Sequence, residues 1–194
     1  MANPIQQLLF LLHITRSHGI VRRYFVVNGF DGALTMLGLN MGFYVGGGVE
    51  ASVALSACLG AAIALGMSGL TSAYISESAE RQLWLRELEE AMVRDLTSSA
   101  HGRAARIVPL LVALVNGAAP FLISLAITVP FWLALADIRP WPDPVVAAIG
   151  LAFIAMFGLG VFLGRVSDSS WLWSGIKAVL IAVVTVAIIW LVGD

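Results

Sequence analysis

Five apolar runs of membrane-spanning length constrain the fold of this chain more than any other feature of its sequence. They cover about residues 24–48, 51–75, 107–135, 143–163 and 171–192. A helix of about 20 apolar residues crosses a hydrocarbon core of roughly 30 Å, so each run is long enough to span a bilayer. Only 12% of the residues are charged, whereas a typical soluble domain carries about 25%. We therefore expect an all-α membrane protein with five transmembrane helices in one membrane domain, residues 1–194.

Two further segments complete this expected layout. Residues 8–14 are apolar but too short to span, and no cation precedes them. An N-terminal interfacial helix therefore fits this segment better than a secretory signal peptide. Residues 76–106 form the hydrophilic stretch of the chain. We expect this cytoplasmic insert to continue the second span as a helix and to turn at 98–102.

The basic residues divide unequally between the two sides of the membrane in this layout. With the N-terminus inside, ten of the eleven Lys and Arg residues fall on the inner side, and only Arg139 lies outside. Positively charged loops favour the cytoplasmic side. We therefore expect a cytoplasmic N-terminus and insert, and a C-terminus on the outside. The compact chain and the lack of an organellar signal favour a prokaryotic plasma membrane.

Composition and motif partners argue against several function classes. A net charge of -1 without a basic block argues against a nucleic-acid partner. The single cysteine, Cys58, excludes an intrachain disulfide and a multi-cysteine metal site. Residues 66–69 match the GxSG pattern of intramembrane serine proteases, and Asp31-Gly32 begins like a phosphatidyltransferase motif. The interior of the spans supplies neither a histidine base nor a second aspartate, so we expect no enzyme activity and no permanently bound cofactor.

Asp31 is the acidic residue placed in the interior of the first span. A carboxylate near the centre of a spanning helix costs about 2.5–3.5 kcal/mol on insertion scales, so it marks an ion pathway or a binding site, or a structural group satisfied by a neighbouring helix. At 100° per residue, Asn28 and Thr35 lie on the same face of the helix as Asp31. Asp31, Thr35 and Asn28 are therefore the candidate metal ligands of this span.

Small residues mark the helix faces that we expect to pack closely. Gly38, Gly42 and Gly46 form a repeated GxxxG on the first span, and the second span repeats a small residue every four positions over 52–72. Both patterns are typical of close helix approach. Met67 lies near the second row, where it either fills the core or offers a thioether ligand to a soft or borderline cation.

The third span carries residues that loosen its backbone ladder. Asn116 and Gly117 precede Pro120, which lacks an N–H group. The freed carbonyls either line a cavity or accompany a packing kink.

Glutamates cover one broad half of the insert helix. They are Glu77, Glu80, Glu87 and Glu90. This face is either a solvated face with i,i+4 ion pairs, such as Glu77 with Arg81 and Glu90 with Arg94, or a site that collects cations before they cross.

Several stretches of the chain resemble the vacuolar iron transporter (VIT) family. RRYFVVNGFDGALTMLG is similar to the first-helix pattern V-x-G-x-N-D-G-[LI]-[VT]-T-x-x-G, and YISESAER is similar to Y-[LV]-S-x-x-S-E-R at the end of the second helix. PLLVALVNGAAPFLISLAITVP resembles the third helix, and FGLGVFLGRVS with the last apolar run resembles the closing pair. The resemblance covers about residues 18–193.

The resemblance implies a dimer that moves Fe²⁺, Mn²⁺ or similar divalent ions out of the cytosol in exchange for protons. Asp31 inherits the position of the pathway aspartate. The chain departs from the family at two second-helix positions, because Gly69 stands where the metal-binding methionine belongs and Ala73 where a glutamate belongs. The insert is also shorter than the family's full metal-collecting domain.

The expected function is therefore homodimeric export of a divalent metal cation, with the ion and protons as the transported species and lipid as the surroundings. Two other readings stay open. The missing methionine and glutamate favour a non-transporting assembly or sensing subunit. The other reading is a carrier of a neutral solute, for which the small glycine and serine residues of the first two spans would suffice.

The expected orientation can be tested by cysteine labelling. In separate Glu87→Cys and Asp137→Cys variants, an impermeant thiol reagent should reach position 87 only from the cytoplasm and position 137 only from outside, because the positive residues hold the insert inside. Labelling of intact and inverted vesicles measures this directly. Reversed labelling would overturn the topology.

Overall fold

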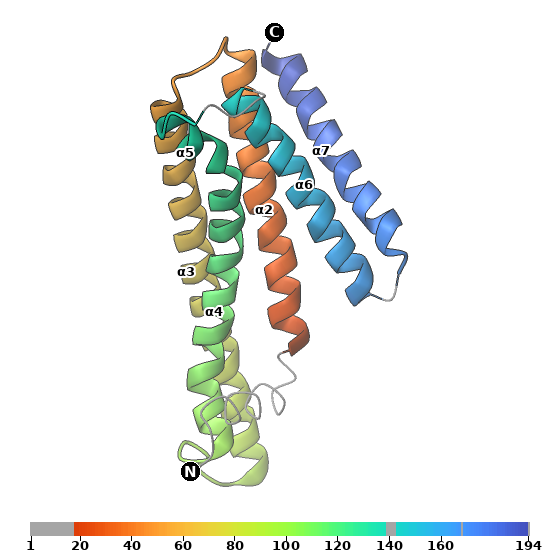
Figure 1. The fold of residues 1–194 in the computed structure, drawn as a ribbon. Coiled ribbons are helices and arrows are strands. Elements are labelled where there is room, and N and C mark those ends of the chain that lie inside the picture. The colour runs from red at the N-terminus through yellow and green to blue at the C-terminus, as the bar shows by residue number, and fades with distance from the viewer. Residues whose placement is uncertain (1–17, 139–142, 168, 194) are drawn as a thin grey trace.

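The computed structural model describes residues 18–138, 143–167 and 169–193, and all the secondary structure within them is helical (Figure 1). The helices are α2 (His18–Val45), α3 (Ala51–Met92), α4 (Ala100–Ile127), α5 (Val129–Leu135), α6 (Pro144–Val166) and α7 (Trp171–Gly193). The expected all-α class is confirmed. The interfacial helix expected at residues 8–14 lies outside the described residues.

Within the described residues, four helices are long and apolar enough to cross a membrane: α3, α4, α6 and α7. α2 has the length but not the composition, because Asn28, Asp31 and Asn40 lower its mean hydropathy. It lies in the middle of the bundle, where it packs against α4, α6 and α7 (Figure 1). A helix enclosed by other helices can carry polar groups that would be costly on a helix surrounded by lipid.

The third apolar run, expected as one span over 107–135, forms two helices. α4 ends at Ile127 and α5 begins at Val129, with Thr128 between them. Pro130 occupies the first turn of α5, where its missing N–H is tolerated, whereas the same residue inside a longer helix would remove a backbone hydrogen bond. The expectation of one continuous helix is therefore wrong at this point.

The insert continues the second span as expected, because α3 runs unbroken to Met92. At 1.5 Å per residue, its 42 residues extend about 63 Å. The second half of α3 and the start of α4 therefore form a helical hairpin that projects beyond α2, α6 and α7 (Figure 1).

The turn of this hairpin lies at residues 93–99, slightly before the expected position. Ser99 caps α4 by accepting hydrogen bonds from the backbone N–H groups of His101 and Gly102. Before the cap, the side chain and backbone N–H of Thr97 donate to Asp95, which lowers the pKa of that carboxyl. The loop is thus closed by local hydrogen bonds.

One of the two ion pairs expected on the insert is confirmed. Arg81 Nε lies 3.4 Å from Glu77 Oε2, one helical turn away. Arg94 lies beyond the end of α3, so it cannot form the expected i,i+4 pair with Glu90 on a helix.

The main apolar core lies around α2. Met36 and Leu37 of α2 pack with Ile127 of α4, Phe131 of α5 and Met156 of α6, and all five are buried. The break at Thr128 lets Phe131 enter this core from a separate short helix.

α3 and α4 cross closely because glycine removes the side chains between them. A Cβ atom built on Gly117 would lie 2.5 Å from the carbonyl oxygen of Gly66, and one on Gly69 would lie 2.9 Å from the carbonyl oxygen of Asn116. Both distances are shorter than a real Cβ contact. The two backbones can therefore touch only with glycine at these positions.

Substitution at the crossing should destabilise the bundle. Gly117→Ala places a methyl group against the Gly66 carbonyl and should lower the free energy of unfolding by about 1–3 kcal/mol, the usual cost of overpacking. Gly158→Ala is the matched control, because that α6 glycine is exposed and no described atom beyond its own helix backbone lies within 4 Å of its Cβ position. Thermal unfolding in a mild detergent measures both. Equal stability of the two variants would show that the crossing tolerates separation.

Candidate cation site on helix α2

Asp31 lies on the one face of α2 that the described chain leaves largely uncovered. The face runs along the helix as Val27, Asp31, Thr35, Gly38 and Gly42, which we call the α2 stripe. Val27, Asp31 and Gly42 are exposed, and Thr35 and Gly38 are half-buried. The neighbours of Asp31 in sequence, Gly32 and Ala33, are buried against the bundle. The helix thus presents its carboxylate outward from the centre of a small-residue face.

An amide cluster holds the inner edge of this face. Asn28 Nδ2 donates to the side-chain oxygen of Asn116 on α4, and also to the carbonyl oxygen of Tyr24 at 2.9 Å. Asn116 Nδ2 in turn donates to the carbonyl oxygen of Gly69 on α3 at 2.6 Å. The cluster ties α2, α3 and α4 together one turn from Asp31. Because both of these Asn28 bonds use its amide donors, its carbonyl oxygen is the atom suited to a cation.

Close packing also brings α2 against α4 beside Asp31. A Cβ on Gly32 would lie 2.7 Å from the carbonyl oxygen of Pro120. The backbone next to Asp31 is therefore fixed by a direct helix contact, which orients the carboxylate away from α4.

Gly69, at the position that the resemblance aligns with a metal-binding methionine, belongs to a helix contact. Its Cα faces the Asn116 backbone, with the Cβ position 2.9 Å from the carbonyl oxygen, and Ala73 one turn later is buried. A methionine at position 69 would push α3 away from α4. Exchange of Gly69 for methionine is therefore a test of packing rather than of ion selectivity.

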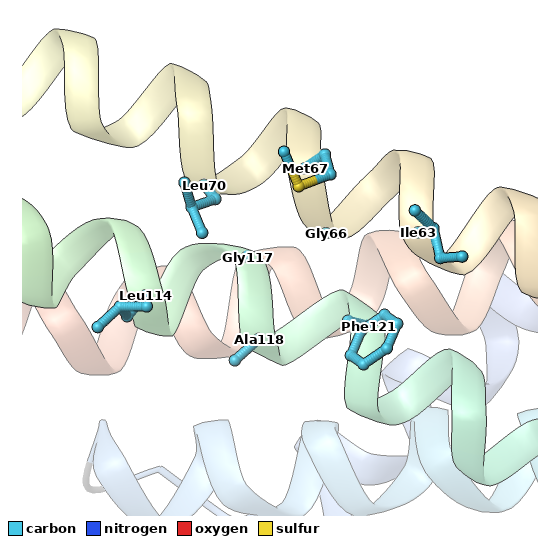
Figure 2. Close-up of a pocket in the computed structure, with 8 residues that line it drawn as sticks. All are labelled: Ile63, Gly66, Met67, Leu70, Leu114, Gly117, Ala118 and Phe121. Carbon is cyan, nitrogen blue, oxygen red and sulfur yellow. The ribbon is translucent and has the colours of Figure 1, made fainter.

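Met67 lies apart from the α2 residues. It is 58% exposed and lines an apolar groove between α3 and α4, with Ile63, Leu114 and Phe121 among the other lining residues (Figure 2). Neither Asp31 nor Thr35 lines this groove. The structure thus brings Asn28, Asp31 and Thr35 onto one side of α2 and leaves Met67 on another surface.

The patterns predicted close helix packing at the three GxxxG glycines of α2 and along the small-residue row of α3. Neither set packs closely within the described residues. The Cβ position of Gly38 lies 3.8 Å from one Ile189 atom, that of Gly42 has no neighbour within 4 Å, and Gly46 is exposed. On α3, most of the row over 52–72 is exposed as well. Gly66 and Gly69, which lie outside that row, make the contact with α4.

The four insert glutamates do not share one environment. Glu77 is 4% exposed and lies beside Arg81, whereas Glu80, Glu87 and Glu90 are exposed along the projecting part of α3. The latter three carboxylates are the ones able to meet ions in solution.

Sequence reasoning did not identify the Asn28–Asn116 bond, nor the buried polar atoms further along the core. Asn40 is fully buried, donates to the carbonyl oxygen of Met36 at 2.7 Å, and leaves its Oδ1 without a described partner. Ser124 Oγ on α4 is also buried and has no described hydrogen-bond partner. An asparagine inside an apolar span signals a buried polar group, but a single sequence does not show which helix supplies its hydrogen-bond partner.

The α2 face offers oxygen ligands. A carboxylate, a hydroxyl and an amide oxygen are the groups that hard divalent cations prefer. Within the described residues, no three His, Cys, Asp or Glu side chains gather as a metal-binding group.

Comparison with known proteins gives a relative that matches most of the chain. No family model matches the chain, and no solved structure matches it. The uncharacterized protein MJ0645 of Methanocaldococcus jannaschii is 32% identical over 160 residues, which cover 81% of this chain and 80% of the archaeal protein. At this identity and coverage, the chain belongs to the same protein family as MJ0645.

Proposed function

We propose that this protein is a homodimeric membrane transporter that exports a divalent cation of the Fe²⁺ or Mn²⁺ type from the cytosol in exchange for protons. The observation that carries the proposal is the position of Asp31, an exposed carboxylate on the central helix of an apolar bundle. The resemblance of residues 22–38 and 74–81 to the vacuolar iron transporter family supports the same reading.

The proposal includes α2 as a fifth span. α2 is 28 residues long, which at 1.5 Å per residue is about 42 Å and exceeds the roughly 30 Å hydrocarbon core. It lies between α4 and α6, which are themselves apolar enough to span. In this proposal the N-terminus and the hairpin lie on the cytoplasmic side of a prokaryotic plasma membrane, because that orientation puts ten of the eleven Lys and Arg residues inside.

A second copy explains both the exposure of Asp31 and its surroundings. A carboxylate facing acyl chains is costly, so Asp31 requires either water or protein against the α2 stripe. Glycine at positions 38 and 42 allows another helix to approach this face closely. Two chains meeting there would supply two carboxylates, with Thr35 and Asn28 beside each, to one divalent ion.

The same carboxylate can couple the ion to protons. In an environment of low dielectric constant, an ionised Asp31 attracts a divalent cation, while the neutral form holds a proton and releases the ion. Alternate occupation of one group by the metal and by the proton is sufficient for exchange.

One observation favours a different function, that of an assembly or sensing subunit without transport. Gly69 packs against Asn116 of α4, and Ala73 is buried, so this chain has no soft ligand on α3 at the position aligned with the methionine. The proposal therefore depends on oxygen ligands from α2.

Asp31→Asn tests the function. It removes the charge at nearly constant shape, and a unit charge about 4 Å from a cation contributes about 4 kcal/mol per cation charge at an effective dielectric constant of 20, so uptake should fall at least about tenfold. Proteoliposome uptake of Fe²⁺, Mn²⁺, Zn²⁺, Co²⁺ and Mg²⁺ measures the effect.

Asp137→Asn is the matched control. Asp137 follows α5, outside the stripe, and has a positive φ of 58°, which asparagine also adopts. The Asp137→Asn variant should take up ions at the same rate as the unmodified protein. Full uptake by Asp31→Asn would refute the mechanism, and no uptake of any ion by the unmodified chain would favour the subunit reading.

Gly42→Leu tests the dimer. Among the described residues, no atom beyond the local backbone of α2 lies within 4 Å of the Gly42 Cβ position. Leucine therefore fits the described monomer, and a change in assembly would come from contact with another chain. We expect the variant to elute as a monomer in mild detergent and to lose transport. Gly150→Leu, on an α6 position with equally open space, should stay dimeric. A dimeric Gly42→Leu would exclude the α2 stripe as the interface.

A further inference from the structure

A second uncovered surface lies between α3 and α4, and its middle section is a groove with apolar walls. The groove measures about 370 Å³, and its lining includes Ile63 and Met67 from α3 and Leu114 and Phe121 from α4 (Figure 2). These positions belong to the membrane-length helices α3 and α4. Figure 2 shows α2 on the far side of α4, so this surface is not the α2 stripe.

A polar hollow continues the groove toward the hairpin. It measures about 300 Å³, and its lining includes Tyr74, Ser78 and Gln82 from α3 and Arg106 from α4. Tyr74 follows Leu70 of the apolar section by one turn, and Ser78 and Gln82 follow at the same interval. Residues four apart lie on one side of a helix, so the polar hollow follows the apolar groove along the same side of α3. We treat them as the apolar half and the polar half of one α3–α4 groove.

The polar half lies where a membrane interface is expected. Arg106 falls between Ala104 and Val108, which pack against Tyr24 at the start of α2. Arg23 lies 5.8 Å from the centre of the Tyr24 ring. Tyrosine and arginine at one level of a membrane bundle are typical of the headgroup region.

Arg106 gives the polar half a positive charge. Arg106 is exposed, and no acidic residue is among the residues that line the polar hollow. Glu89, further along α3, accepts a hydrogen bond from the backbone N–H of Leu96 in the hairpin turn. A guanidinium with nearby hydroxyl and amide donors suits a phosphate group.

We propose that this α3–α4 groove binds an anionic phospholipid, with one acyl chain in the apolar half and the phosphate at Arg106. From Ile63 to Ser78 the groove extends about 22 Å at 1.5 Å per residue, close to the 20–22 Å of one leaflet with its headgroups. The inference does not depend on the proposed transport function.

Lipid retention by the purified full-length chain tests the headgroup half. After incubation with phosphatidylglycerol or phosphatidylcholine in mild detergent, native mass spectrometry counts the lipids that stay bound. Arg106→Gln should reduce phosphatidylglycerol retention about fivefold, because the substitution removes the attraction between one guanidinium and the anionic lipid. Retention of phosphatidylcholine should stay unchanged. Arg86→Gln removes the same charge from the hairpin outside the groove and should retain both lipids. Equal retention of phosphatidylglycerol by Arg106→Gln and Arg86→Gln would overturn the proposal.

Ala118→Phe tests the apolar half. Ala118 lines the groove and is exposed, so phenylalanine fills the space of the acyl chain and should lower phosphatidylglycerol retention severalfold. Ala126→Phe, on an exposed α4 position outside the groove lining, is the control. Unchanged retention would refute the acyl-chain site, and a change of oligomeric state in Ala118→Phe alone would show that a second chain occupies the groove instead.

Discussion

The close crossing of α3 and α4 is the contact on which the rest of the structure depends. Helices in lipid gain little from the hydrophobic effect when they associate, so packing and interhelical hydrogen bonds must hold them together. At Gly69 and Gly117 the backbones of α3 and α4 touch. This contact holds the two helices side by side, and they continue together as the projecting hairpin. It also sets Asn116 where it can bond both Gly69 and Asn28. The position of α2, and with it that of Asp31, follows from this bond and from the contact of Gly32 with Pro120.

Among the long helices of the described residues, α2 is the one that lacks a segment apolar enough to cross a membrane, and other helices enclose it. α4, α6 and α7 shield α2, so Asn28 and Asn40 bond within the protein rather than face lipid. This enclosure is incomplete along the α2 stripe. A polar helix that is enclosed on most sides and open on one is the arrangement expected of a pathway or an interface, since a purely structural helix would gain stability from an apolar residue in place of Asp31.

Much of the helical layout could be predicted from the sequence, because hydrophobic run length and i,i+4 charge spacing are local signals. The continuation of α3 past residue 75 and the Glu77–Arg81 pair are examples. The break at Thr128 was missed because Pro130 can either kink a helix or begin one. Pairing of helices is not a local signal. The small-residue row on α3 and the pair Gly66 and Gly69 look alike as patterns, yet the pair packs against α4 while most of the row is exposed.

The α2 stripe and the α3–α4 groove require different occupants. In a membrane, every polar group must be satisfied by protein or by water that the protein admits. Asp31 on the α2 stripe can meet water or another chain but not acyl chains, whereas the groove beside Met67 and Phe121 is apolar and suits acyl chains rather than water. Since these surfaces lie on different sides of α4, assembly through the α2 stripe leaves the α3–α4 groove facing the bilayer. A polar path between two chains and a lipid on the outer side of each chain are therefore compatible in one assembly.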